Sequence, residues 1–394
     1  MRFLFSSLPL PGHSYPLIPL ALATRDAGHD VQFATGKSFH GTLASFDLEA
    51  VPAGLEIMDA LEQAMGGPGD YASFTPERQA ELERLAVAEV LPRAFLADLG
   101  PVLDRFKPDL VVHDIGNAGA LFAANLAGIP GACHTIGRVQ TGAGNKSIET
   151  MLSKLAGEVG VELPVSATRG GGNTFIDIYP PSLQDEEILA MTNRIVMRPV
   201  PVTAHGELPS WVAERDREAG RPLVYLTFGA VFSREPALRQ AIEGLATLDV
   251  DVLVAVGPNV DIQSLGDFGD SVRIDTSEPL AELLAHVDLV VHHGGTGLAV
   301  GTLANGVPQL ILPQGDPDRF SSNDLFTNAN AITKGGVGGQ LLAENQTAEA
   351  ISKRAKELLS DDEARAAARK VAAELAEMPS PEATVAVLAE IASR

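Results

Sequence analysis

Short apolar runs alternate with stretches of helical length along the chain. At its start, residues 1–6 and 31–34 form apolar runs that we expect to be strands, and a helix is expected from 16 to 27, with Gly28 at its end. Strand, glycine-containing loop, helix and strand in this order are typical of a doubly wound parallel sheet with right-handed crossovers. The pattern predicts an α/β fold.

The middle of the chain is less regular. Residues 55–107 are largely helical in pattern, and 109–135 again give a strand, a helix and a strand. From 137 to 172 the pattern loses its regularity and ends in three glycines. Such segments more often shape a variable pocket or a lid than a core.

Prolines and polar residues dominate a stretch between two strongly apolar parts, where we place a linker. The strands that we expect beyond it are 223–227, 252–256, 272–274, 289–292 and 309–312. After Gly339 only helical patterns remain. We therefore divide the chain into a first Rossmann-like domain (1–200), a linker (201–221), a second Rossmann-like domain (222–378) and a C-terminal helix that packs toward the first domain (379–394).

Two segments of the chain share one pattern. Residues 109–130 and 288–308 both open with Asp-Leu-Val-Val-His and close with Gly-Ile-Pro or Gly-Val-Pro. Superposition of the segments places Asp114 where His293 stands. Because loops at the carboxyl ends of parallel strands line the ligand crevice of such sheets, we expect both residues in one cleft between two similar halves.

The later segment has the composition of an anion site. Its apolar run breaks at Gly294 and Gly295 and continues as a small-residue helix. Such glycines let the backbone approach a ligand, and the first free N–H groups of the helix favour a phosphate. A ring N–H of His293 could add a hydrogen bond; alternatively, His293 only caps the turn.

His13 and Asp114 are candidates for acid–base chemistry. Both follow strands that we expect in the same sheet. A histidine there can take a proton near neutral pH, and a carboxylate would orient its ring and stabilise the charged form. The pair would activate a hydroxyl nucleophile. The alternative is that both residues merely cap neighbouring helices.

Composition narrows the class of protein. With 394 residues the chain is long enough for two domains, and a net charge of −22 argues against nucleic acid or an anionic membrane as partner. No apolar stretch approaches the length of a membrane span. The single cysteine, Cys133, fits a reducing compartment, so a cytoplasmic location is expected. The apolar start could pass for a secretory signal, but Pro9 and Pro11 interrupt it early.

Several common site motifs are absent from the sequence. No serine nucleophile elbow occurs, and no Gly-x-Gly-x-x-Gly follows a strand, so a nicotinamide site is disfavoured. Asp316-Pro317-Asp318 could supply two carboxylates to a metal ion, but this is also a common loop composition. We expect no metal and no cofactor.

Four motifs together resemble the natural-product glycosyltransferases of the GT-B fold, which move sugars from nucleotide diphosphates onto macrolides, aromatic polyketides and enediyne-type aglycones in actinobacteria. They are Gly12-His13-x-x-Pro16-Leu17-x-Pro19-Leu20-Ala21, Pro222-Leu223-Val224-Tyr225-Leu226-Thr227-Phe228-Gly229, Val291-His292-His293-Gly294-Gly295-Thr296-Gly297 with Gly306-Val307-Pro308-Gln309, and Met378-Pro379-Ser380-Pro381. The resemblance covers nearly the whole chain. It implies two doubly wound domains that face each other across a cleft, with the C-terminal helix crossing back to the first.

The resemblance also implies roles for residues. His13 would deprotonate the acceptor hydroxyl while Asp114 holds it, and the sugar would be transferred with inversion. Gly229, Glu278, His293, Gly294, Gly295, Thr296 and Asp318 would bind the donor. No metal would be needed, because the helix N-terminus stabilises the leaving diphosphate.

Departures from the family include Ala230 and Leu298, where hydroxyl residues are common, and two further changes at the base and the donor sugar. Where an aromatic residue usually stacks on the base, this chain has Ser277 and Glu278. The usual Asp-Gln pair for the donor sugar appears as Asp318-Arg319, in a loop with extra residues. Loss of the glutamine indicates a deoxy or otherwise modified sugar.

The expected partners are a dTDP- or UDP-sugar and a hydrophobic aglycone, and a homodimer is left open. Two other functions remain as alternatives. A nucleotide-sugar epimerase of similar architecture would turn over donor without an acceptor. A catalytically silent relative that activates a partner enzyme should have lost its catalytic positions, yet His13, Asp114 and His293 are all present.

Overall fold

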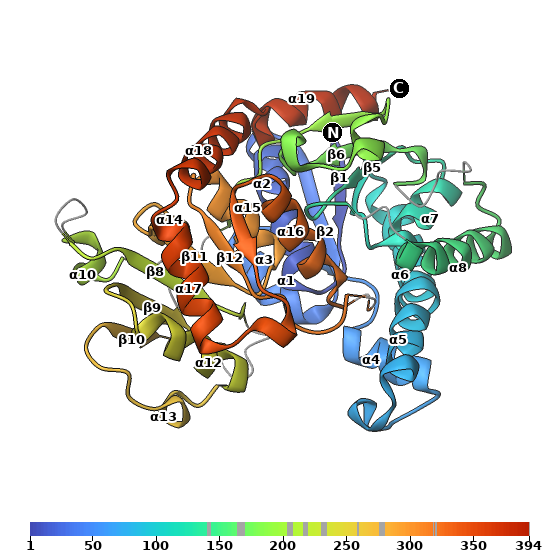
Figure 1. The fold of residues 1–394 in the computed structure, drawn as a ribbon. Coiled ribbons are helices and arrows are strands. Elements are labelled where there is room, and N and C mark those ends of the chain that lie inside the picture. Colours follow the sequence, from blue (N-terminus) through green and yellow to red (C-terminus); the bar gives the residue numbers. More distant parts are fainter. Residues whose placement is uncertain are drawn as a thin grey trace.

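Each half of the chain builds one parallel sheet covered by helices (Figure 1). The structure is a computed structural model that describes residues 1–139, 143–163, 170–202, 208–215, 220–229, 235–257, 260–275, 280–317, 319 and 321–393. The first sheet has seven strands in the order β3-β2-β1-β4-β5-β6-β7, and the second has six in the order β10-β9-β8-β11-β12-β13. Both orders reverse beside a central strand, as in doubly wound folds.

The strands are β1 Arg2–Ser6, β2 Asp30–Thr35, β3 Glu49–Pro52, β4 Leu110–Asp114, β5 Gly131–His134, β6 Thr174–Asp177, β7 Arg194–Val196, β8 Leu223–Thr227, β9 Asp251–Ala255, β10 Val272–Asp275, β11 Leu289–His292, β12 Gln309–Ile311 and β13 Gly338–Gln340. The helices are α1 Pro11–Ser14, α2 Ile18–Asp26, α3 His40–Ser45, α4 Ile57–Met65, α5 Pro76–Leu85, α6 Leu91–Phe106, α7 Ala118–Leu126, α8 Ala143–Val159, α9 Glu186–Leu189, α10 Ser210–Ala213, α12 Glu235–Ala246, α13 Ile262–Leu265, α14 Leu280–Leu284, α15 Thr296–Ala304, α16 Asn323–Lys334, α17 Ala348–Leu359, α18 Asp362–Glu377 and α19 Pro381–Ala392.

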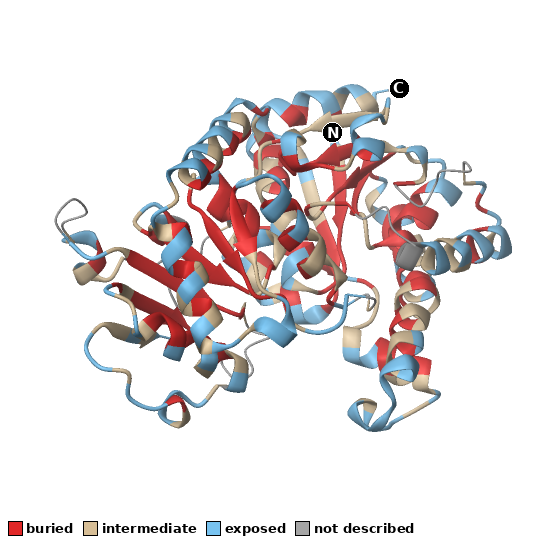
Figure 2. Ribbon diagram, viewed as in Figure 1, coloured by how far each residue is buried: buried red, intermediate tan, exposed pale blue. Residues whose placement is uncertain are grey.

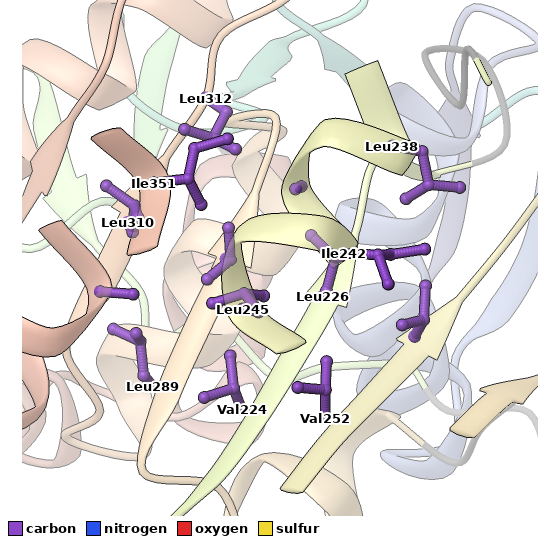
Figure 3. Close-up of a cluster of buried hydrophobic side chains, with 14 of the residues drawn as sticks. Val224, Leu226, Leu238, Ile242, Leu245, Val252, Leu289, Leu310, Leu312 and Ile351 are labelled. Carbon is purple, nitrogen blue, oxygen red and sulfur yellow. The ribbon is translucent and has the colours of Figure 1, made fainter. Parts of the chain in front are cut away.

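The central strands are buried on both faces, while the covering helices alternate buried and exposed positions (Figure 2). In the second half, side chains of β8, β9, β11 and β12 pack against α12 and α17. Ten residues of this core are labelled in Figure 3: Val224, Leu226, Leu238, Ile242, Leu245, Val252, Leu289, Leu310, Leu312 and Ile351. Full burial of each such side chain contributes roughly 1.5–3 kcal/mol, so the sheet is rigid enough to hold loops at its edge.

The C-terminal helices contact different halves. Leu375 of α18 packs in a cluster with α15 and α16, whereas Val385 and Leu388 of α19 pack against α2 in the first half. Figure 1 shows α19 crossing back over the first sheet. The GT-B arrangement that the resemblance implies is therefore confirmed.

The halves also share an apolar interface. Tyr179 and Leu183, from the connection after β6, pack among Val300 of α15 and Ile332 of α16. A hydrogen bond from Ser182 N–H to the Glu374 carboxylate of α18, at 2.8 Å, borders this interface. These contacts join the connection between β6 and β7 to the second half.

Several predictions of elements were wrong or incomplete. The segment 8–13 was expected to be a loop, but Pro11–Ser14 forms a short helix with proline at its first position, where the missing N–H costs nothing. The strands β3, β6, β7 and β13 were missed. Among the described residues, no helix combines the length and apolar composition that a membrane crossing requires.

Candidate active site

The predicted site residues lie at the reversal point of each sheet. His13 comes after β1 and Asp114 ends β4, and these two strands pair. Gly229 comes after β8 and His293 after β11, which pair in the second sheet. The crevice of a doubly wound sheet opens at this point, so both halves present their ligand-binding loops there.

His13 and Asp114 form a buried pair. Nδ1 of His13 lies 3.0 Å from Oδ1 of Asp114, and the two residues are 9% and 0% exposed. The second carboxylate oxygen, Oδ2, accepts the Leu8 N–H at 2.7 Å, and Oδ1 also accepts the Gly116 N–H. A buried carboxylate is costly unless it is paired and hydrogen-bonded, and these three contacts supply that pairing.

Two serines anchor the helix that carries His13. Ser14 Oγ donates to the Leu8 carbonyl at 3.0 Å and lies 2.8 Å from Ser7 Oγ. Both serines are 0% exposed. The sequence analysis missed them, although a hydroxyl residue directly after His13 was visible in the motif. They fix α1 to the end of β1 and so fix the ring of His13.

Gly116 leaves room for the pair. A Cβ atom at this position would lie 2.7 Å from Cε1 of His13 and 2.9 Å from Oδ1 of Asp114. The ring would have to move. We expect Gly116→Ala to lower kcat for the reaction catalysed by this pair about tenfold, because a misplaced base transfers its proton poorly.

Gly12→Ala is the matched control for this prediction. It adds a methyl group beside His13 in the chain, but nothing lies within 4 Å of the added atom. Steady-state kinetics of both variants, with thermal unfolding to verify folding, check the expectation. Equal rates for Gly116→Ala and Gly12→Ala would contradict it.

The loop after β11 is held by a neutral histidine. Nε2 of His292 lies 2.8 Å from Oε1 of Gln309, and Nδ1 accepts the Gly294 N–H at 3.1 Å. Burial lowers the pKa of His292 to about 4, so the ring is neutral at physiological pH, with its proton on Nε2. The Gly294 N–H is thus engaged by His292, and the donor contact expected of Gly294 stays a prediction.

The backbone conformation at position 294 requires a glycine. Its φ of +103° is strained for other residues, and a Cβ atom would lie 2.7 Å from the Leu325 carbonyl oxygen. Gly295 caps α15 without a side chain, and a Cβ atom there would lie 2.7 Å from Nε2 of His293. At the start of α15, Gly295 and Thr296 are half-buried and Gly297 is exposed.

His293 is neutral as well. Burial lowers its pKa to about 3, as does neighbouring His292, while a hydrogen bond with the Thr227 carbonyl acts in the opposite direction. Gly229 comes close to the same ring, because a Cβ atom at Gly229 would lie 3.1 Å from its Cε1. The ring is therefore fitted tightly between the loops after β8 and β11.

Asn328 of α16 is a further site residue that the sequence analysis missed. Its Nδ2 donates to the Gly294 carbonyl at 2.9 Å and to Thr296 Oγ1 at 2.9 Å, and its side chain is buried. Because Thr296 Oγ1 accepts this hydrogen bond, its own proton can be directed elsewhere. Asn328 thus holds the loop and orients the Thr296 hydroxyl.

The two halves meet at these loops. A Cβ atom at Gly137, after β5, would lie 1.9 Å from Cγ2 of Thr296. Asp324, in the first turn of α16, is near enough to His13 for the two charges to interact. Burial raises the pKa of Asp324 to about 6, and the charge of His13 and two backbone hydrogen bonds lower it. The charges of His13 in the first half and Asp324 in the second half therefore interact.

Two predicted donor residues, Glu278 and Asp318, lie outside the described residues. Arg319, where the resemblance expected a sugar-binding glutamine, points instead to Glu83 of the first half. Across the described ranges, no group of three or more His, Cys, Asp or Glu side chains is arranged to hold a metal ion.

Comparison with known proteins identifies the family of this chain. Models described as erythromycin biosynthesis protein CIII-like match residues 22–229 with the N-terminal domain and 239–391 with the C-terminal domain. L-demethylnoviosyl transferase of Streptomyces niveus is 32% identical, with 99% of this chain and 97% of the relative covered.

Solved structures extend the similarity to the fold. The glycosyltransferase SsfS6 of Streptomyces sp. SF2575, in complex with thymidine diphosphate, has a TM-score of 0.77 at 25% identity, with 99% of both chains covered. The calicheamicin glycosyltransferase CalG4 has a TM-score of 0.81 at 20% identity, with 100% of this chain and 98% of the other covered. The latter supports the fold alone.

Proposed function

The chain belongs to the erythromycin biosynthesis protein CIII-like family of glycosyltransferases, and from this premise we propose that it transfers a deoxysugar from a dTDP- or UDP-sugar to a hydroxyl group of a hydrophobic aglycone, with inversion at the anomeric carbon. The observation that carries the proposal is the His13–Asp114 pair, 3.0 Å apart and buried, at the edge of the first sheet that meets α15. dTDP is the favoured nucleotide, since SsfS6 binds thymidine diphosphate.

His13 acts as the general base in this proposal. Its Nδ1–H donates to Asp114, which leaves the lone pair of Nε2 to accept the proton of the acceptor hydroxyl. The acceptor oxygen then attacks the anomeric carbon, and the bond from this carbon to the diphosphate breaks with its electrons on the diphosphate oxygen. Asp114 stabilises the imidazolium that forms. Attack from the face opposite the diphosphate inverts the configuration.

The start of α15 receives the leaving diphosphate. The N–H groups of Gly295 and Thr296 and the Thr296 hydroxyl supply hydrogen bonds, and the helix macrodipole supplies partial positive charge. His293 is neutral, so it contributes a hydrogen bond rather than a charge, and a phosphate oxygen competes with the Thr227 carbonyl for it. No metal is needed for this stabilisation.

The donor sugar is proposed to contact a carboxylate near His13. Asp318 is the residue that the sequence indicates, and Asp324 is a second candidate because its charge interacts with that of His13. The residue after Asp324 is Leu325, which is buried and apolar. A carboxylate without an adjacent amide satisfies fewer hydroxyl groups, which favours a deoxysugar. Glu278 and Gly229 remain proposed donor contacts.

Calorimetric titration with dTDP, UDP, GDP and ADP tests the donor site. We expect dTDP or UDP to bind most tightly, and His293→Ala to weaken that binding about tenfold, which is about 1.4 kcal/mol. His286→Ala is the matched control, because His286 precedes β11 and so lies at the other end of the same strand. Absence of binding by all four nucleotides would refute the proposed donor site.

A further inference from the structure

A polar cluster joins α5 of the first half to the connection between β12 and α16 of the second. At its centre is Glu83 of α5, which is only 7% exposed. Its carboxylate accepts the Tyr71 hydroxyl at 2.6 Å, the Ser321 hydroxyl at 3.2 Å and Nε of Arg319 at 3.1 Å. Nη2 of Arg319 donates to the same carboxylate. We call Tyr71, Gln79, Glu83, Arg319 and Ser321 the clasp.

The first half's side of the clasp is ordered by its own hydrogen bonds. Gln79 Nε2 donates to the carbonyls of Tyr71 and Phe74, each at 3.1 Å, and this turns its Oε1 to accept Nη1 of Arg319 at 2.9 Å. The Tyr71 hydroxyl accepts a further hydrogen bond from Arg319. Three side chains of the first half therefore converge on one guanidinium, whose planar fork suits such a site.

The Arg319 guanidinium keeps its charge in this contact. Burial acts to lower the pKa of the Arg319 guanidinium, but the hydrogen bond and charge of Glu83 outweigh burial and raise it. Burial and Glu83 together raise the pKa of Tyr71, so its hydroxyl keeps its proton. A buried Glu83 carboxylate that lost Arg319 would be left as an uncompensated charge. This cost favours the contact between Arg319 and Glu83.

The backbone of Arg319 leads directly to the site. Its carbonyl accepts the N–H groups of Ser322 at 3.2 Å and of Asn323 at 2.9 Å, at the start of α16. Asp324 is the next residue, and its charge interacts with that of His13. The same residue thus contacts the first half through its side chain and holds the first turn of α16 through its backbone.

We propose that Arg319 is a positioning residue, whose contact with Glu83 holds the second half against α5 and fixes the first turn of α16, which carries Asp324. The proposal rests on the glycosyl transfer proposed above. This role explains the extra residues before α16, because they include Arg319, whose side chain reaches the first half. The clasp touches neither the His13–Asp114 pair nor the start of α15 directly, so it acts on the rate of transfer rather than on diphosphate binding.

Arg319→Ala is the first test. We expect kcat for transfer to fall about tenfold while the dissociation constant of dTDP stays within twofold. Arg78→Ala is the matched control, because Arg78 is on the same helix as Glu83 and pairs with exposed Glu81 at 2.7 Å. It should change neither quantity by more than twofold. A parallel loss of kcat and dTDP affinity in Arg319→Ala would overturn the proposal.

A double variant separates positioning from the cost of a buried unpaired charge. Arg319→Ala leaves Glu83 charged and buried, whereas Glu83→Gln combined with Arg319→Ala removes that charge. If Arg319 positions α16, the double variant regains thermal stability but its kcat remains about tenfold low. Recovery of kcat in the double variant would reduce the clasp to a structural ion pair and overturn the proposal.

Amide hydrogen exchange gives a readout that does not depend on activity. In the free protein, Arg319→Ala should speed exchange at the amides of Ser322 and Asn323, which donate to the Arg319 carbonyl, and Arg78→Ala should not. Unchanged exchange at both amides would overturn the proposal. If the wild-type chain neither bound nucleotide nor transferred sugar, the proposed function would fail, while this measurement would still report on the clasp.

Discussion

Replacing His13 with glutamine is expected to lower kcat for sugar transfer by about 10²- to 10⁴-fold, the usual contribution of a general base. The glutamine amide can still donate to Asp114, so the buried carboxylate keeps a partner and the fold should persist. The amide cannot accept a proton from the acceptor hydroxyl at neutral pH. Because His13 does not contact the start of α15 in the proposed mechanism, the dissociation constant of dTDP should change less than twofold.

His29→Gln is the matched control for this prediction. His29 is a histidine of the same half that precedes β2, at the end of the sheet remote from His13. Kinetics with a saturating nucleotide-sugar, together with dTDP titration of both variants, make the comparison. A His13→Gln enzyme that kept more than a third of the wild-type kcat would show that another group accepts the proton.

The central strands could be predicted from the sequence because both their faces are buried. β1, β4, β8 and β11 read as uninterrupted apolar runs, which is typical of parallel strands covered by helices. The missed strands are short and lie at or near sheet edges, and they include polar or small residues, such as Arg194 in β7 and Gly338 in β13. No apolar periodicity marks such strands, since their pairing depends on neighbours that are distant in sequence.

Part of the site could be predicted for the same reason. Asp114 ends β4, His293 directly follows β11, and His13 lies in the short helix after β1. Within the first sheet, the pairing of β1 with β4 brings His13 and Asp114 to one edge. The engagement of the Gly294 N–H could not be predicted, since it depends on the rotamer and tautomer of His292.

The sequence analysis placed the sugar-binding pair at Asp318 and Arg319, in a loop with extra residues, and did not single out Asp324. The position of Asp324 within α16 is informative. Asp324 lies four residues before Asn328, which is one helical turn, and side chains at this spacing share a face. The sequence therefore contained a polar pair on one face at the start of α16.

Asp324→Asn is expected both to stabilise the fold and to lower kcat. The pKa of Asp324 in the folded chain is about 6, above its ordinary value of 3.8. The folded state therefore binds the proton of the Asp324 carboxyl group more tightly than the unfolded state does. This proton's contribution to the free energy of unfolding is fully present below about pH 4 and is lost as pH rises through 6. At pH 7.5 the charged, partly buried carboxylate costs on the order of 2 kcal/mol. Asparagine has no such charge.

Denaturant unfolding at two pH values checks the stability half of this prediction. At pH 7.5, Asp324→Asn should raise the free energy of unfolding by on the order of 2 kcal/mol, and at pH 4.5 the gain should largely disappear. Asp362→Asn supplies a control of opposite sign. Asp362 is an exposed carboxylate in the first turn of α18, where its charge favours the helix, so its loss should destabilise the chain by roughly 0.3–1 kcal/mol.

The second part of this prediction, on kcat, concerns why a charge that destabilises the fold is retained. If the Asp324 carboxylate accepts a hydrogen bond from the donor sugar and faces His13 as it becomes positively charged, its replacement should lower kcat by about ten- to a hundredfold, in line with the roughly 1.5–3 kcal/mol of a charge-assisted hydrogen bond. A more stable but slower enzyme would mean that α16 carries its carboxylate for catalysis at the expense of folding. An Asp324→Asn enzyme that gained stability without losing kcat would leave Asp318 as the candidate for the donor sugar.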